Sequence, residues 1–325
     1  MGGSRWSDDF YNAREADRAA TGKSAFSYSA TATRVHDKLN TLGVKLRESR
    51  DSAAHPNSKS IAVLFDVTGS MGSIPVTLQK KLAELMGLLI RKGYVDHPQI
   101  LFGAVGDATC DRAPLQIGQF ESGIEMDDDL SRFYLEGGGG GQKTESYELA
   151  AYFIARHTAI DCFEKRGEKG YLFIIGDEAY YPKVSAKQVN AIIGDKLQTD
   201  IPTREIFDEL RKRFEVFFLI PRGASNAGDN QIRAAWQKLL GQNVLSLDDP
   251  AAVCEAIALS IGMCEGKIDL ADGLHDLRDY GTASTVINTI STALAPLARA
   301  TANRKTAAIT GHLPALGPGG SLNRL

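Results

Sequence analysis

The 325-residue chain has few cysteines and no long apolar run, and these absences exclude several classes of protein. Its four cysteines lie far apart and form no CxxC pair: Cys110, Cys162, Cys254 and Cys264. We therefore expect reduced, buried thiols and no disulfide framework. No stretch approaches the roughly 20 apolar residues that span a bilayer. The amino-terminal MGGSRWSDDF also lacks the apolar run of a secretory signal, so the sequence predicts a cytoplasmic protein with no membrane partner.

An excess of charge of either sign is also lacking. Lys and Arg number 37 against 40 Asp and Glu, a formal net charge of -3, which disfavours nucleic acid as a partner. With 43% hydrophobic residues the composition is that of a globular protein with a sizeable core. At roughly 150 residues per domain, the length allows one large domain with extensions or two small domains.

Short apolar runs alternate with amphipathic segments in the middle of the chain. Four near-continuous runs are typical of strands buried on both faces of a parallel sheet: residues 61–66, 100–105, 171–175 and 216–220. Residues 114–120 follow the second run directly, so we expect an antiparallel edge strand there, with a last strand at 244–247 and a closing helix at 249–264. The sequence predicts a doubly wound, Rossmann-like α/β domain over residues 58–266, with helices on both faces.

The flanking regions differ from this domain in composition. Residues 1–57 form an N-terminal extension rich in Ala, Ser, Asp and Arg, and residues 267–325 form a C-terminal helical extension that ends in a flexible tail from residue 302. Four apolar residues in the C-terminal extension share one helix face: Val286, Ile290, Leu294 and Leu297. This face either packs on the domain's own surface or docks a partner.

Three other features have ordinary structural explanations. The acidic stretch at residues 125–129 is expected to be the solvated start of a helix. His157 and Trp236 lie on apolar helix faces, so we expect them in the core.

Candidate ligands appear where the first strand ends, because open α/β sheets bind ligands at the carboxyl ends of their strands. The strand runs into DVTGSMG at residues 66–72. Asp66, Thr68 and Ser70 alternate, so the backbone can point three oxygen-bearing side chains to one side, while Gly69 and Gly72 permit a tight turn. Hard oxygen ligands of this kind suit Mg²⁺ or Mn²⁺.

DVTGSMG resembles the DxSxS motif of the von Willebrand factor A family, which forms that family's metal ion-dependent adhesion site. The resemblance covers about residues 58–266 and implies two further ligands. These are Thr144, which follows the glycine run 137–141, and Asp177, at the end of the third apolar run. Thr68 stands where the family more often has serine, and it keeps the hydroxyl.

The resemblance does not settle the roles of several other residues near these loops. Glu178 stands where the family usually has glycine, and it adds a negative charge near the ion. The long glycine run leaves open whether Thr144 or Ser146 is the ligand. Asp107, Ser146 and Glu178 are candidates to hydrogen-bond to the ligands or to water bound to the ion, without contacting the ion themselves.

The resemblance implies a function in binding. If Asp66 and Asp177 act largely through water, the ion keeps its affinity for an anion, and a partner protein would supply an Asp or Glu carboxylate. FGAVGD and the glycine run are most similar to the same segments of intracellular bacterial and kinase-associated members of the family. Because intracellular members often work beside MoxR-type AAA+ ATPases, the resemblance implies such an ATPase as a partner. We find no convincing catalytic constellation and do not expect an enzyme.

A nucleotide hydrolase is the alternative. GGGGGQKTES is similar to the phosphate-binding loop GxxxxGK[ST], with Lys143 and Thr144, and YLFIIGDE would add Asp177 and Glu178. However, Gln142 replaces the glycine required before the lysine, and the preceding MDDDLSRFYLE is polar and helical where a buried strand is needed. For metal-assisted hydrolysis, only Glu178 and Lys143 are candidate groups.

Overall fold

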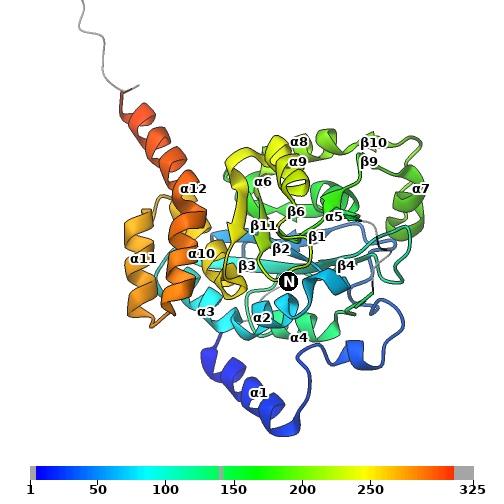
Figure 1. Ribbon diagram of the computed structural model, residues 1–325, viewed down its shortest axis with the longest axis horizontal. Coiled ribbons are helices and arrows are strands. Elements are labelled where there is room, and N and C mark those ends of the chain that lie inside the picture. Colours follow the sequence, from blue (N-terminus) through cyan, green and yellow to red (C-terminus); the bar gives the residue numbers. More distant parts are fainter. Residues whose placement is uncertain (1–4, 139–140, 142, 311–325) are drawn as a thin grey trace, which may run out of the picture.

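The computed structural model describes residues 5–138, 141 and 143–310, with side chains to residue 303 (Figure 1). Of the flexible tail predicted from residue 302, residues 302–310 form the end of a helix, contrary to the prediction, and residues 311–325 lie outside the described residues. Within the described part of the chain, no helix combines the length and the apolar character needed to cross a bilayer.

A six-stranded sheet with the order β12-β11-β7-β2-β3-β4 forms the centre of the fold. Neighbouring strands are parallel except β4, which pairs antiparallel with β3 at one edge. The strands are β2 (Ser58–Asp66), β3 (His97–Val105), β4 (Leu115–Ile117), β7 (Gly170–Ile175), β11 (Phe214–Pro221) and β12 (Val244–Leu247). The predicted α/β fold, with its mostly parallel sheet and antiparallel edge strand, is confirmed.

Helices cover both faces of the sheet because the strands are apolar on both sides. All nine residues of β2 are buried, and its alternate side chains join two separate apolar clusters, with Val63 in one and Leu64 in the other. The first cluster includes side chains from α2 (Ile74–Lys80), α3 (Leu82–Met86), α4 (Glu125–Arg132) and α10 (Val253–Cys264). The second includes side chains from α5 (Tyr147–Arg156), α8 (Thr203–Arg213) and α9 (Asn230–Leu240).

The fold also contains short strand pairs and further α-helices. Two-residue or three-residue strands form small pairs beside the main sheet: β1 (Arg47–Ser49) with β6 (Thr158–Ile160), β5 (Thr144–Glu145) with β8 (Ala179–Tyr180), and β9 (Lys183–Val184) with β10 (Ile201–Pro202). The remaining α-helices are α1 (Asp8–Thr21), α6 (Asp161–Glu164), α7 (Ala186–Gln188), α11 (Leu270–Asp279) and α12 (Ser284–Thr310).

The acidic stretch at the start of α4 is not solvated, contrary to the sequence prediction. Asp127 is fully buried, and it accepts hydrogen bonds from Arg14 (3.2 Å), Arg18 (2.5 Å) and Gln79 (3.0 Å). Both arginines belong to α1 of the N-terminal extension. The charge is buried because α1 packs over it, a contact that the local sequence of α4 does not reveal.

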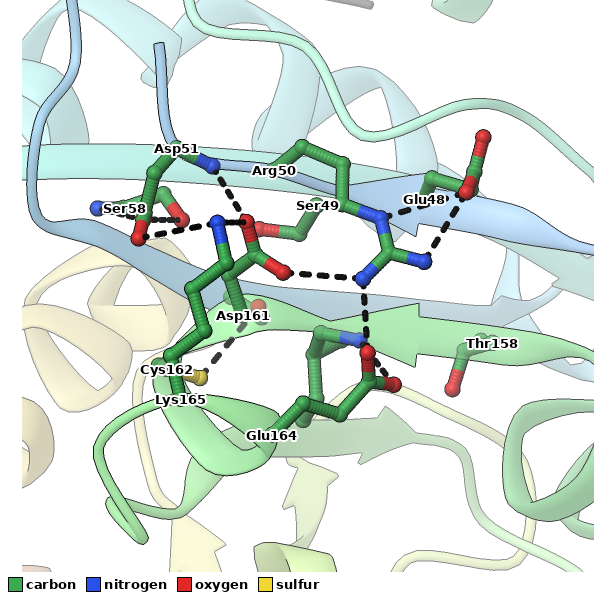
Figure 2. A network of polar contacts seen from close by, with 12 residues as sticks. Glu48, Ser49, Arg50, Asp51, Ser58, Thr158, Asp161, Cys162, Glu164 and Lys165 are labelled. Atoms are coloured by element: carbon green, nitrogen blue, oxygen red, sulfur yellow. Dashed lines mark hydrogen bonds and ion pairs between the residues drawn. The ribbon is translucent and has the colours of Figure 1, made fainter.

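The N-terminal extension also contacts the domain at a second place. β1 pairs in parallel with β6, and Figure 2 shows the polar network next to this pairing. Arg50 donates to Asp161 at 2.8 Å and to Glu164 at 2.6 Å, and the Asp51 backbone N–H donates to Asp161 at 2.8 Å. Two segments about a hundred residues apart are therefore held together by charge-assisted hydrogen bonds.

The Asp161 carboxylate is expected to make stability depend on acid pH. Burial alone would raise its pKa, but hydrogen bonds from Lys165, the Asp51 backbone and Arg50 outweigh burial and lower the pKa from 3.8 to about 2. A lowered pKa gives stability that is complete above about pH 4 and is lost as the pH falls through about 2. Asp161→Asn should therefore lower the free energy of unfolding by about 1–2 kcal/mol at pH 7 and by much less near pH 2.

Chemical denaturation across this pH range measures the effect. Asp248→Asn is the control, because the Asp248 side chain is 72% exposed and its loss should change stability by less than about 0.5 kcal/mol. Equal losses for Asp161→Asn at pH 7 and pH 2 would contradict the assignment.

The apolar face of α12 packs on the domain, which decides between the two interpretations of that helix. Val286, Ile290, Leu294 and Leu297 are all at most 4% exposed and belong to the first apolar cluster. α12 contacts α10, α11 and β12 (Figure 1). These four side chains are therefore part of the core and are not free to dock a partner.

The cysteine prediction is correct in part. The four cysteines form no disulfide within the described part of the chain, and Cys162 and Cys254 are buried. Cys110 is exposed and Cys264 is half-buried, contrary to the prediction. Cys110 lies in the loop after β3, and Cys264 is the last residue of α10, so neither is held inside a layer of the fold. His157 and Trp236 are buried as predicted.

Candidate metal centre

The first of the predicted ligand loops begins at the carboxyl end of β2 and turns tightly there. Asp66 is the last residue of β2, and its Oδ1 accepts hydrogen bonds from the Thr68 backbone N–H (2.7 Å) and the Thr68 hydroxyl (2.6 Å). The Thr68 and Ser70 hydroxyl oxygens lie 3.2 Å apart. The DVTGS sequence therefore folds so that its three oxygen-bearing side chains gather on one side of the turn.

The glycine run lies directly against this turn. The Gly69 backbone N–H donates to the Gly138 carbonyl at 2.7 Å, and Gly137 N–H donates to the Val67 carbonyl at 3.3 Å. A Cβ on Gly69 would lie 3.1 Å from the Gly137 carbonyl oxygen, so a side chain there would push the two loops apart. Glycine at position 69 therefore serves the close approach of two backbones.

Asp177 joins the first loop from the end of β7. Its Oδ1 accepts the Ser70 hydroxyl at 2.7 Å, and its Oδ2 accepts the Asn226 backbone N–H at 2.6 Å. Asp177 is fully buried. Parallel strands β2 and β7 are neighbours in the sheet, so their carboxyl ends bring these side chains together across 107 positions of sequence.

The second predicted loop reaches the site through the short strand β5. Thr144 pairs with Ala179 and Glu145 pairs with Tyr180, just after Asp177. Glu145 is 3% exposed, and its carboxylate lies within 4.8 Å of those of Asp66 and Glu178. Thr144 is partly exposed, and side chains alternate along a strand. The role of Thr144 as a ligand stays a prediction.

The three supporting candidates have defined partners. Ser146 accepts the Ala108 backbone N–H at 2.9 Å, which holds the start of α5 against the loop after β3. Asp107 accepts the Thr109 backbone N–H at 2.8 Å and the Tyr181 hydroxyl at 2.9 Å. The Glu178 Oε1 accepts from the Asn226 side-chain amide at 3.2 Å.

Burial and mutual repulsion raise the pKa values of acids in this centre. Burial raises the pKa of Asp66 to about 6, although hydrogen bonds from Thr68 and Tyr147 oppose the shift. Burial, and then the negative charges of Asp66 and Glu178, raise the pKa of Glu145 to about 11. Burial also raises the pKa of Glu178 to about 7. Each carboxylate is therefore poorly compensated as an anion in the protein alone.

Sequence reasoning missed Glu145, Tyr147 and Asn226. The Tyr147 hydroxyl donates to Asp66 Oδ2 at 2.9 Å, and the aromatic ring fills the space beside Gly176. Glu145 stands between the candidate hydroxyl residues Thr144 and Ser146, and alternation along a strand was the available signal for it. Asn226 follows β11, and it lies near Asp177 because β11 and β7 are neighbouring strands in the sheet.

Lys143 and the segment before the glycine run bear on the phosphate-loop alternative. The Lys143 Nζ lies 2.8 Å from the Asp229 carboxylate at the start of α9, and the Lys143 side chain is 61% exposed. The glycine run follows α4 and an irregular stretch, whereas a phosphate loop follows a buried strand. Gln142 lies outside the described residues.

Comparisons with known proteins give no family. No protein-family model matches the chain, and no curated protein sequence matches it. Among solved structures, the pilus adhesin SpaC from Lactobacillus rhamnosus GG, in its open conformation, is 11% identical with a TM-score of 0.43. The match covers 66% of this chain and 31% of that one.

A second similar structure is that of a mussel byssus protein. Proximal thread matrix protein 1 from the mussel byssus is 11% identical with a TM-score of 0.41, covering 66% of this chain and 48% of its own. This chain therefore spans less than half the length of either protein.

Proposed function

We propose that this chain binds a partner protein through a Mg²⁺ or Mn²⁺ ion held by Asp66, Thr68, Ser70, Thr144 and Asp177. The observation that carries the proposal is the 2.7 Å hydrogen bond from Ser70 to Asp177, which joins two of the three predicted loops. Hydroxyl and carboxylate oxygens are the ligands that such hard cations prefer. The donor chemistry of these residues therefore fits the ion.

The chain's own contacts hold the proposed ligands in place before any ion binds. Thr68 and Tyr147 orient the two oxygens of Asp66, and the Asn226 backbone orients Asp177. Contacts of this kind fix ligand geometry and reduce the cost of ordering the site. When bound, the ion would supply an electrophilic position for a carboxylate from the partner.

The resemblance to the von Willebrand factor A family supports the wider setting of this proposal. We propose that the chain acts in the cytoplasm as an adaptor and not as an enzyme. On that resemblance alone, a MoxR-type AAA+ ATPase is the proposed partner, and neither nucleic acid nor a membrane is.

Removal of a proposed ligand should weaken ion binding. Ser70→Ala deletes one hydroxyl oxygen and should lower the Mg²⁺ affinity at least ~10-fold, and the Asp66→Ala, Ser70→Ala double variant should bind no measurable Mg²⁺. Calorimetric titration of Mg²⁺ into each protein measures this. Ser73→Ala is the matched control, because Ser73 is an exposed serine three positions further along the chain and its side chain makes no cap hydrogen bond to α2.

Partner capture tests the second half of the proposal. Affinity capture with the wild-type chain should lose its partner on addition of a chelator and in the double variant. Capture that ignores both changes would remove the ion from the mechanism. ATP binding that disappears in Lys143→Ala would instead favour the nucleotide-hydrolase alternative.

A further inference from the structure

Three buried carboxylates from separate segments meet beside the proposed ligands. Asp66 ends β2, Glu145 lies in β5, and Glu178 follows β7. One oxygen of each lies within 4.8 Å of the others, and the residues are 0%, 3% and 6% exposed. Oxygen atoms at this spacing can all contact a single divalent cation.

Two of these carboxylates have an oxygen to which no described residue donates a hydrogen bond. The Oε2 atoms of Glu145 and Glu178 are buried and have no hydrogen-bond partner among the residues that the structure describes. Asp66 differs, because Thr68 and Tyr147 already donate to it. A buried anionic oxygen without a donor is unfavourable, so the two glutamates point to a cationic ligand that occupies the space between them.

A count of charges shows why one ion would not suffice. Asp177 is also buried, so four acids surround the centre, and once all four are ionised as metal ligands a single divalent ion offsets only two of their negative charges. The nearby Lys143 does not compensate them, because its ammonium group pairs with Asp229. A second divalent ion would bring the ligands and ions to charge balance.

We propose that Asp66, Glu145 and Glu178 bind a second divalent cation, beside the one proposed at Thr68, Ser70 and Asp177, with Asp66 shared by the two. This carboxylate site goes beyond the proposed function, since it needs no partner protein. Three carboxylates bind a divalent ion more tightly than the first site does, in which neutral hydroxyls make up most of the ligands. The carboxylate site is therefore occupied first as the metal concentration rises.

The ion stoichiometry, measured with Mn²⁺ as the probe, tests this inference. Equilibrium dialysis of the full chain should give two Mn²⁺ per wild-type chain, with the tighter ion lost in Glu145→Gln and in Glu178→Gln. The amide has nearly the shape of a protonated acid, so it would preserve a site in which the two glutamates merely share a proton. Glu148→Gln is the matched control, because Glu148 is a fully buried glutamate outside the cluster, and it should keep both ions.

The outcomes separate this inference from the proposed function. Ser70→Ala should lose only the weaker ion. A wild-type chain that binds one ion, lost in Ser70→Ala and kept in both glutamine variants, would overturn the carboxylate site and leave the proposed function standing. One ion that is lost in the glutamine variants but kept in Ser70→Ala would support the carboxylate site and overturn the proposed function. Two ions retained in a folded Glu145→Gln or Glu178→Gln protein would overturn the inference.

Discussion

Replacement of Trp236 by alanine is expected to lower the free energy of unfolding by about 4 kcal/mol. Trp236 is fully buried, and its ring stacks on Phe218 with centroids 3.8 Å apart and an angle of 11° between the planes. It also meets the rings of Tyr147, Phe207 and Tyr180. The cavity left by the indole cannot be filled by these rigid rings, so most of the lost contact energy is not recovered. Urea denaturation measures the loss.

Trp236 also supports the candidate metal centre through its indole N–H. That group donates to the Glu178 backbone carbonyl at 2.9 Å, next to Asp177. Trp236→Phe keeps most of the packing but removes the donor, so it should cost about 1–2 kcal/mol and weaken Mg²⁺ binding several-fold. Trp6→Phe makes the same change in the N-terminal extension and should leave Mg²⁺ affinity unchanged. Equal Mg²⁺ affinities for both variants and wild type would show that the indole has no part in positioning the site.

Gly176→Ala is expected to lower both the stability and the Mg²⁺ affinity. A Cβ at Gly176 would lie 2.0 Å from the Tyr147 hydroxyl oxygen and 2.8 Å from its Cζ. Tyr147 is fully buried, so its displacement should cost about 1–3 kcal/mol. Displacement also breaks the hydrogen bond to Asp66, and loss of such a supporting contact reduces metal affinity by about 10- to 100-fold. Denaturation and calorimetric titration measure the two effects.

A double-mutant cycle separates the steric effect from other causes. Tyr147→Phe removes the atom closest to the new methyl group, so the Gly176→Ala, Tyr147→Phe variant should be more stable than the sum of the single effects predicts. Gly228→Ala is the control, because a Cβ at that glycine meets no atom within 4 Å. Additive losses in the cycle would show that the hydroxyl is not the obstacle.

The sequence predicted the fold well because the strands are buried on both faces. Continuous apolar runs such as residues 171–175 have few alternatives to a central parallel strand, and the absence of a helix before residues 114–120 required an antiparallel neighbour. The candidate ligands at Asp66, Thr68 and Ser70 could be named for a similar reason, since their spacing is local and sits at a strand end.

Other features depend on contacts between distant segments and had no local signal. Asp127 looked like a surface acid until α1 placed Arg14 and Arg18 over it. Glu145 was not singled out in the sequence, and its carboxylate lies near those of Asp66 and Glu178 in the structure, where β5 pairs with β8.

The sequence by itself determined the order of strands and helices along the chain. It also determined which loop carries the alternating oxygen-bearing side chains, because hydrophobic periodicity and residue spacing act over a few residues. Only the tertiary structure decided which charges are buried and what faces them. The sign and magnitude of an electrostatic interaction depend on through-space distance and on exclusion of water, and neither is encoded in a short stretch of sequence.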